Sequence, residues 1–118
     1  STYLKEGYVT YSNEAKEKLL GVPAEILRQY GAVSPQTAEA MAEGGARAAG
    51  ADICIAVTGI AGPDGGTEDK PVGLVYMSCY CRGKLHTEKN QYTGSRSKIR
   101  EYSVASALTL LRRAILEH

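Results

Sequence analysis

Phenylalanine and tryptophan are absent from this sequence, and its aromatic residues are eight tyrosines. A buried tyrosine needs a hydrogen-bond partner for its hydroxyl, so we expect aliphatic residues and alanine to form most of the core. Cysteine is scarce as well, since Cys54, Cys79 and Cys81 are the only three. Such a small, odd set does not make a disulfide framework and is typical of a protein from a reducing compartment.

An excess of one charge is also lacking, because 14 Lys and Arg residues face 13 Asp and Glu residues. A nucleic-acid-binding protein is expected to carry a basic excess or stripe, whereas the one local basic cluster, residues 96–100, is followed by Glu101. No apolar run approaches the ~20 residues that span a bilayer, and residues 1–6 lack the apolar core of a signal peptide. These absences predict a cytoplasmic protein with no nucleic-acid or membrane partner. They still permit one anionic group on a small ligand.

The 118 residues, 43% of them hydrophobic, are enough for one ordinary globular domain covering 1–118. The continuous apolar run at 53–57 predicts a strand buried on both faces. Caps, turn residues and periodicity predict the other elements: strands at 7–11, 72–81 and 84–92, and helices at 14–20, 23–30, 35–49 and 97–117. This order predicts a single three-layer α/β/α domain with a mixed sheet. Its few strands suggest that N-terminal elements are missing.

The last predicted helix carries an amphipathic stripe with helical spacing, which is typical of a helix with one buried face. The stripe consists of Val104, Ala107, Leu108, Leu111, Ala114 and Ile115.

A glycine-rich loop follows the buried strand, a place where α/β proteins often bind ligands. The loop covers residues 59–71, and with the preceding threonine its first part is Thr58-Gly59-Ile60-Ala61-Gly62. Its glycines would let backbone N–H groups approach an anion or a carbonyl oxygen. The loop has neither the Walker A nor the GxGxxG spacing. By composition alone, a plain surface loop is as good an interpretation.

Two further positions are candidates for chemistry. Lys16 follows Tyr11 at the start of a predicted helix, where positive potential would lower the pKa of the amine toward that of a general base. Arg96 stands at the start of the last predicted helix, where an arginine and free N–H groups could bind a phosphate. A solvated helix lysine and an incidental arginine beside a serine cap are the simpler alternatives.

Other residues give no metal or nucleophile signal. His86 and His118 have no acidic or cysteine cluster near them in sequence, so a zinc site is not expected. Cys79 and Cys81 would project from the same strand face, and core packing is the favoured interpretation of this pair.

Four segments together resemble the CinA C-terminal domain family. In chain order they are Tyr11-Ser12-Asn13-Glu14-Ala15-Lys16, Gly31-Ala32-Val33-Ser34, Thr58-Gly59-Ile60-Ala61-Gly62-Pro63 and Lys70-Pro71-Val72-Gly73. The resemblance covers nearly the whole chain. It implies an α/β/α fold, a homo-oligomer that is commonly a dimer in that family, and no metal or cofactor requirement. The family contains competence/damage-inducible proteins and nicotinamide-nucleotide amidohydrolases, which convert nicotinamide mononucleotide and water to nicotinate mononucleotide and ammonia.

The same resemblance implies roles for individual residues. Lys16 would be the general base, Tyr11 its hydrogen-bonding neighbour, and Thr58 a residue that arranges the catalytic groups. Gly59, Ile60, Ala61 and Gly62 would line the substrate, and Arg96 would hold its phosphate.

One departure from the family concerns the nucleophile. The family's Ala-Glu-Ser-Cys-Thr-Gly-Gly motif, which supplies the serine, does not occur in these 118 residues. We therefore expect an N-terminally truncated amidohydrolase domain that is inactive in this form. The alternative is a non-catalytic nucleotide-binding or scaffolding module.

Overall fold

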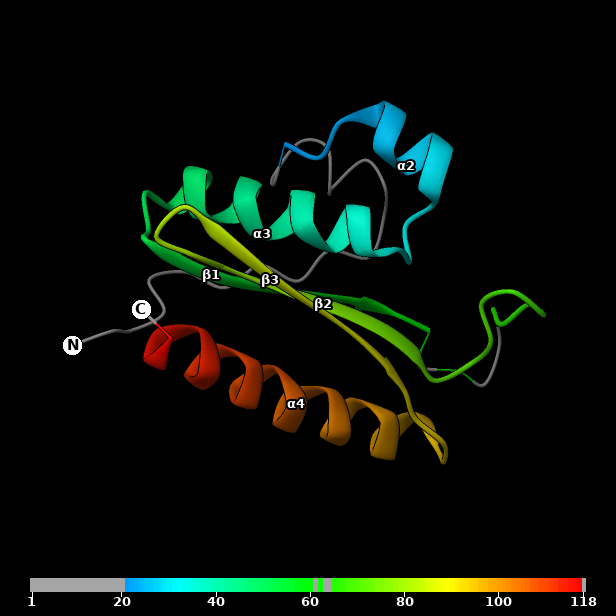
Figure 1. The fold of residues 1–118 in the computed structure, drawn as a ribbon. Helices are drawn as coiled ribbons and strands as arrows, with labels where there is room; N and C mark the ends of the chain where they lie inside the picture. Colours follow the sequence, from blue (N-terminus) through cyan, green and yellow to red (C-terminus); the bar gives the residue numbers. More distant parts are fainter. Residues whose placement is uncertain (1–20, 61, 63–64, 118) are drawn as a thin grey trace.

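A computed structural model describes residues 21–60, 62 and 65–117 of this chain, and these form three layers (Figure 1). Helices α2 (Ala24–Tyr30) and α3 (Pro35–Ala49) cover one face of a sheet, and α4 (Arg96–Leu116) covers the other. The three-layer α/β class predicted from the sequence is thereby confirmed. The strand and helix expected at 7–11 and 14–20 lie outside the described residues.

The sheet holds β1 (Ile53–Gly59), β2 (Leu74–Cys81) and β3 (Lys84–Gln91) in the order β1-β2-β3. Both described pairings are antiparallel, with Gly59 opposite Val75 and Cys81 opposite Lys84. Among the described residues the sheet is therefore antiparallel throughout, and the mixed character expected from the sequence is not seen in it.

Local signals place the ends of these elements within two residues of the predicted positions. The difference that matters for the site is that β1 continues to Gly59, so Thr58 and Gly59, which follow the predicted strand, belong to the observed one. The Ser34 hydroxyl accepts a hydrogen bond from the Thr37 amide at 3.1 Å, and Pro35 follows at the first position of α3. Gly50 ends that helix in the left-handed conformation, with φ 62°. Arg82 and Gly83, both with positive φ, form the two-residue turn between β2 and β3.

Two hydrophobic clusters hold the layers together, one on each face of the sheet. Met77, Cys79, Ile99 and Leu110 belong to the cluster beneath α4. The other cluster, beneath α2 and α3, is formed by Val22, Leu27, Met41, Ala42 and Ala56. β1 contributes to both clusters, which confirms the prediction of a strand buried on two faces, although Val57 near its end is 39% exposed.

The predicted stripe on the last helix is only partly correct. Ala114 is buried, but Val104 and Leu108 are each 61% exposed, and Leu110, which lies outside the stripe, is 1% exposed. The buried side of the helix is therefore rotated toward Leu110 relative to the predicted stripe, and on this side the Tyr92 hydroxyl donates a hydrogen bond to the half-buried Ser106. Because the two hydroxyl groups are hydrogen-bonded to each other, Ser106 can lie on the half-buried side of the helix, where an apolar residue would be expected.

Among the residues that the structure describes, no helix combines the length and apolar character required to cross a bilayer.

Candidate functional site

The candidate site begins at the end of β1, where Thr58 is 7% exposed. Its hydroxyl donates a 2.6 Å hydrogen bond to the carbonyl oxygen of Ala32, in the corner between α2 and α3. The next residue must be glycine, because a Cβ at Gly59 would lie 2.8 Å from a methyl group of Val75 and 2.9 Å from the Leu74 oxygen. Thr58 is therefore fixed both by the strand and by a helix corner 26 residues away in sequence.

Backbone hydrogen bonds join the two ends of the glycine-rich loop, and we call this junction of Ile60 with Gly73 and Leu74 the neck. The Ile60 amide donates to the Leu74 oxygen at 3.0 Å, and the Gly73 amide donates to the Ile60 oxygen at 2.7 Å. Gly73 has φ 93°, and a Cβ there would lie 1.9 Å from the Tyr92 oxygen, so only glycine fits at this crossing. Because the Ile60 amide is used in the neck, Ile60 can line a ligand only through its side chain or carbonyl group.

Within the loop, Gly62 is buried and has φ 81°. A Cβ on it would lie 2.6 Å from a methyl group of Val72, which shows how closely the two halves of the loop pack. The neighbouring Ala61 lies outside the described residues.

Arg96 joins the loop from the start of α4. Its guanidinium donates a 3.0 Å hydrogen bond to the Gly62 carbonyl oxygen, 34 residues away. Ser95 caps the helix by accepting from the Lys98 amide at 3.2 Å. A guanidinium has five N–H donors, and the Arg96 side chain is exposed. It can therefore hold the loop and still offer donors to an anion.

The corner between α2 and α3 forms the third side of the site, and sequence reasoning assigned it no role. Lys70 donates from Nζ to the Tyr30 oxygen at 2.7 Å, while Ser34 and Thr37 donate to the Gly31 oxygen at 3.0 and 2.6 Å. The motifs that contain Gly31 and Lys70 were visible in the sequence. No local pattern indicated that they meet.

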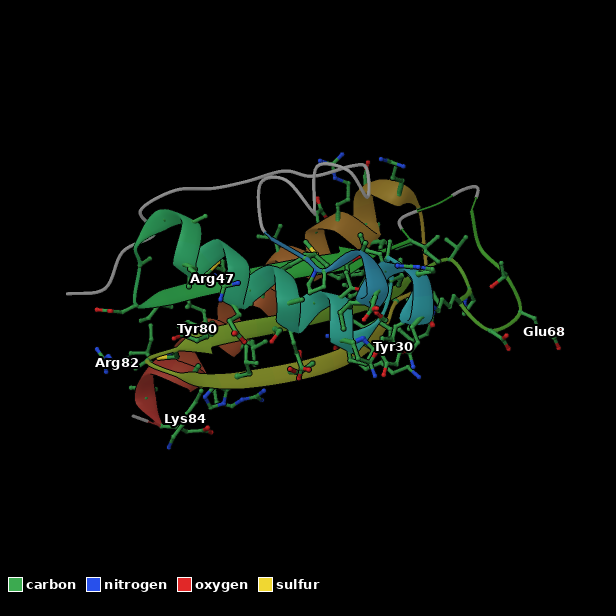
Figure 2. The ribbon with its side chains drawn as sticks, turned by 90° about the horizontal axis from the view of Figure 1, so that it is seen from above. Tyr30, Arg47, Glu68, Tyr80, Arg82 and Lys84 are labelled. Atoms are coloured by element: carbon green, nitrogen blue, oxygen red, sulfur yellow. The ribbon has the colours of Figure 1, made fainter. Side chains whose placement is uncertain are left out.

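Figure 2 shows which end of the sheet this is: Tyr30 and Glu68 lie at one end, and Arg82 and Lys84 at the other. The structure brings five predicted site residues to the Tyr30 end, namely Thr58, Gly59, Ile60, Gly62 and Arg96. Tyr11 and Lys16, the predicted catalytic pair, lie outside the described residues.

A shallow hollow lies one turn further along α4, lined by Ser97, Arg100, Glu101 and Val104. Of the predicted site residues that the structure describes, none lines this hollow.

Two of the cysteines, Cys54 and Cys79, are poor nucleophiles in this fold. Burial and the neighbouring thiols of Cys81 and Cys54 raise the pKa of Cys79 to about 11, and burial raises the pKa of Cys54 as well. Thiolate, the reactive form, is therefore scarce at neutral pH. Cys79 and Cys81 are both fully buried in the cluster beneath α4, which confirms the packing interpretation. Within the described ranges, no group of three or more His, Cys, Asp or Glu side chains could hold a metal ion.

The fold and this geometry define a class of protein: a three-layer α/β domain with a glycine-lined candidate site at one end of its sheet. Comparison with known proteins then gives the family. The family model of the CinA C-terminal domain matches residues 1–115, and the chain belongs to that family.

Similar proteins carry the names of this family. A CinA-like protein of Kosmotoga olearia is 53% identical over 116 residues, which are 98% of this chain and 28% of that protein. A CinA-like protein of Geobacter sulfurreducens is 50% identical with the same coverage. The chain thus spans 28% of the length of these relatives.

Solved structures agree with the family assignment. The competence/damage inducible protein CihA from Agrobacterium tumefaciens has a TM-score of 0.89 and 44% identity, over 92% of this chain and 67% of that chain. The competence damage-inducible protein A from Klebsiella pneumoniae has a TM-score of 0.86 and 37% identity, over 91% and 66% of the two chains.

Proposed function

We propose that the complete protein containing this domain hydrolyses the amide of nicotinamide mononucleotide, giving nicotinate mononucleotide and ammonia. The observation that carries the proposal is that Thr58 and Arg96 lie at the two ends of one short stretch of the glycine-rich loop. Thr58 precedes the loop, and Arg96 is bonded to its Gly62. A group that organises the chemistry and a group that fits a phosphate are thus joined by one short segment.

In the proposed reaction, a serine supplied from outside these 118 residues attacks the carboxamide carbon. Lys16 takes the serine proton and transfers it to the departing ammonia, as in other Ser-Lys hydrolases. A water molecule then cleaves the resulting ester, with Lys16 as its base, and returns the serine. Tyr11 is assigned as the hydrogen-bonding neighbour of Lys16. No metal or cofactor takes part in this scheme.

The direction of the Thr58 hydrogen bond defines what this residue can contribute. Its only hydroxyl proton is donated to Ala32, so the lone pairs of the hydroxyl oxygen are left to accept. Thr58 can therefore accept a hydrogen bond from the ammonium form of Lys16 or from the serine hydroxyl. We assign it as an acceptor that orients the catalytic pair.

Arg96 and Gly62 are assigned to the substrate. Since Arg96 keeps donors beyond the one bonded to Gly62, it can bind the phosphate and hold the nucleotide by its non-reacting end. The Gly62 amide is the loop donor that we assign to the developing oxyanion, a contribution worth about 2.7–4 kcal/mol per donor in a characterised hydrolase.

The test is ammonia release from nicotinamide mononucleotide by the complete gene product. We expect Arg96→Ala to raise KM at least tenfold, as befits loss of a charged hydrogen bond to phosphate. Arg112→Ala, which removes another exposed arginine of α4, is the control and should leave KM unchanged.

Lys16→Ala should abolish ammonia release without unfolding the protein. Full activity in that variant would refute the mechanism. Calorimetric binding of the nucleotide without turnover by the complete gene product would instead favour a nucleotide-binding module.

A further inference from the structure

Three successive carbonyl groups in the corner between α2 and α3 are held by side chains from three different segments. Lys70 of the glycine-rich loop donates to the Tyr30 oxygen at 2.7 Å. Thr37 of α3 donates to the Gly31 oxygen at 2.6 Å, and Thr58 of β1 donates to the Ala32 oxygen at 2.6 Å. The position of this corner is thus linked to the loop, to the helix and to the strand.

The loop side of this arrangement is built to present Lys70. The Thr67 amide donates to the Lys70 oxygen at 2.9 Å, and the Lys70 amide donates to the Thr67 hydroxyl at 3.0 Å. Val72 packs so closely on the loop that a Cβ at Gly66 would lie 2.8 Å from one of its methyl groups. The backbone of Lys70 therefore lies in a turn that two hydrogen bonds with Thr67 hold in place.

The helix side offers a fitting partner. Tyr30 is the last residue of α2, where carbonyl oxygens lack helical partners and carry partial negative charge. Gly31 follows with φ 82°, and a Cβ on it would lie 2.8 Å from Lys70 Nζ. A side chain at Gly31 would therefore crowd the ammonium, and the positive φ already favours glycine at this position.

We propose that Lys70 is a positioning residue that ties the glycine-rich loop to the α2–α3 corner and thereby keeps the Ala32 oxygen in place to orient the Thr58 hydroxyl. The part that concerns turnover rests on the proposed amidohydrolase function. In this role the Lys70 ammonium is bonded to the Tyr30 oxygen and does not touch the substrate. Its effect on turnover passes through the position of Ala32 and the Thr58 hydroxyl bonded to it.

Two variants and one control test this proposal in the complete gene product. Lys70→Met removes the charge and the donors but keeps a long apolar stem, and Lys70→Arg keeps charge and donors. Lys84→Met removes an exposed lysine at the other end of the sheet (Figure 2) and is the control.

The first measurement is hydrogen exchange, which does not depend on activity. In Lys70→Met we expect amides in 30–34 and 65–73 to exchange about five- to tenfold faster than in the wild type, because the tether between these segments is lost. Lys70→Arg should exchange nearly as slowly as the wild type, and Lys84→Met should not differ from it. Exchange in Lys70→Met equal to that of the wild type would overturn the proposal, as would equal acceleration in Lys84→Met.

The second measurement separates kcat from KM with nicotinamide mononucleotide. We expect Lys70→Met to lower kcat about tenfold, since small displacements of a catalytic group cost rate. KM should change less than twofold, because the phosphate is assigned to Arg96, and Lys70→Arg should restore most of the rate. A change confined to KM would overturn the positioning role. If the wild-type protein releases no ammonia, the proposed function fails, and the exchange measurement still decides whether Lys70 is the tether.

Discussion

The hydrogen bond from Thr58 to Ala32 gives a prediction that can be worked through from the structure. Thr58→Val keeps the shape of the side chain but removes the hydroxyl that donates at 2.6 Å to the Ala32 oxygen. A typical protein hydrogen bond contributes about 0.5–1.5 kcal/mol, and leaving a buried acceptor without its donor costs about 1–3 kcal/mol. Thr58 is 7% exposed and Ala32 is half-buried, so water can replace the donor only in part. We expect the free energy of unfolding to fall by about 1–2 kcal/mol.

The assay is urea unfolding of Thr58→Val beside a control of the same chemistry. Thr109 on α4 is exposed, and its hydroxyl donates to the Ala105 oxygen at 3.0 Å. Thr109→Val therefore removes a hydroxyl from a place where water replaces it, and the change in stability should stay within about 0.5 kcal/mol. Thr58→Ser, which retains the hydroxyl, should lie between the wild type and Thr58→Val. Equal stabilities for Thr58→Val and Thr109→Val would refute the reasoning that this bond fixes the corner.

Two further predictions concern the core. Leu110→Ala should lower the free energy of unfolding by about 2–5 kcal/mol, because Leu110 is 1% exposed. Leu108 is 61% exposed, so Leu108→Ala should change this free energy by no more than about 0.5 kcal/mol. Urea unfolding of both variants checks this, and a larger loss in Leu108→Ala than in Leu110→Ala would refute the orientation of α4 in the structure. Cys79, whose pKa is raised from 9.0 to about 11, should resist iodoacetamide at pH 8 until the protein is unfolded. Since its folded pKa is the higher one, the unfolded state ionises first, and stability should fall as the pH rises from about 9 to about 11. Cys79→Ala should flatten that decline, and rapid labelling of Cys79 in the folded protein would contradict the prediction.

The outlines of the described elements were readable from the sequence because their signals are local. Ser34-Pro35 marks the start of α3, and Gly50 its end, through conformations set within one or two residues. The turn at Arg82 and Gly83 is likewise fixed by backbone preference. The apolar run at 53–57 was sufficient to predict β1 as a strand packed on both faces.

Hydrophobic spacing was a weaker guide to the orientation of α4. The helix has apolar residues on more than one side, so its sequence is compatible with more than one buried face. In the structure Leu110 is buried with Ile99 and Ala114 in the cluster beneath α4. Which side of the helix is buried depends on what the sheet packs against it, and the spacing of residues within the helix does not show that.

The sequence by itself determined the element boundaries, the glycine-rich loop after β1 and the resemblance to the CinA C-terminal domain. Only the tertiary structure decided that Thr58 donates to Ala32, that Arg96 holds Gly62 and that Lys70 reaches Tyr30. These partners are 26, 34 and 40 residues apart. Backbone propensity acts over a few residues, whereas contacts at such separations exist only after the three helices and the sheet have packed and brought distant carbonyl groups within reach of a donor.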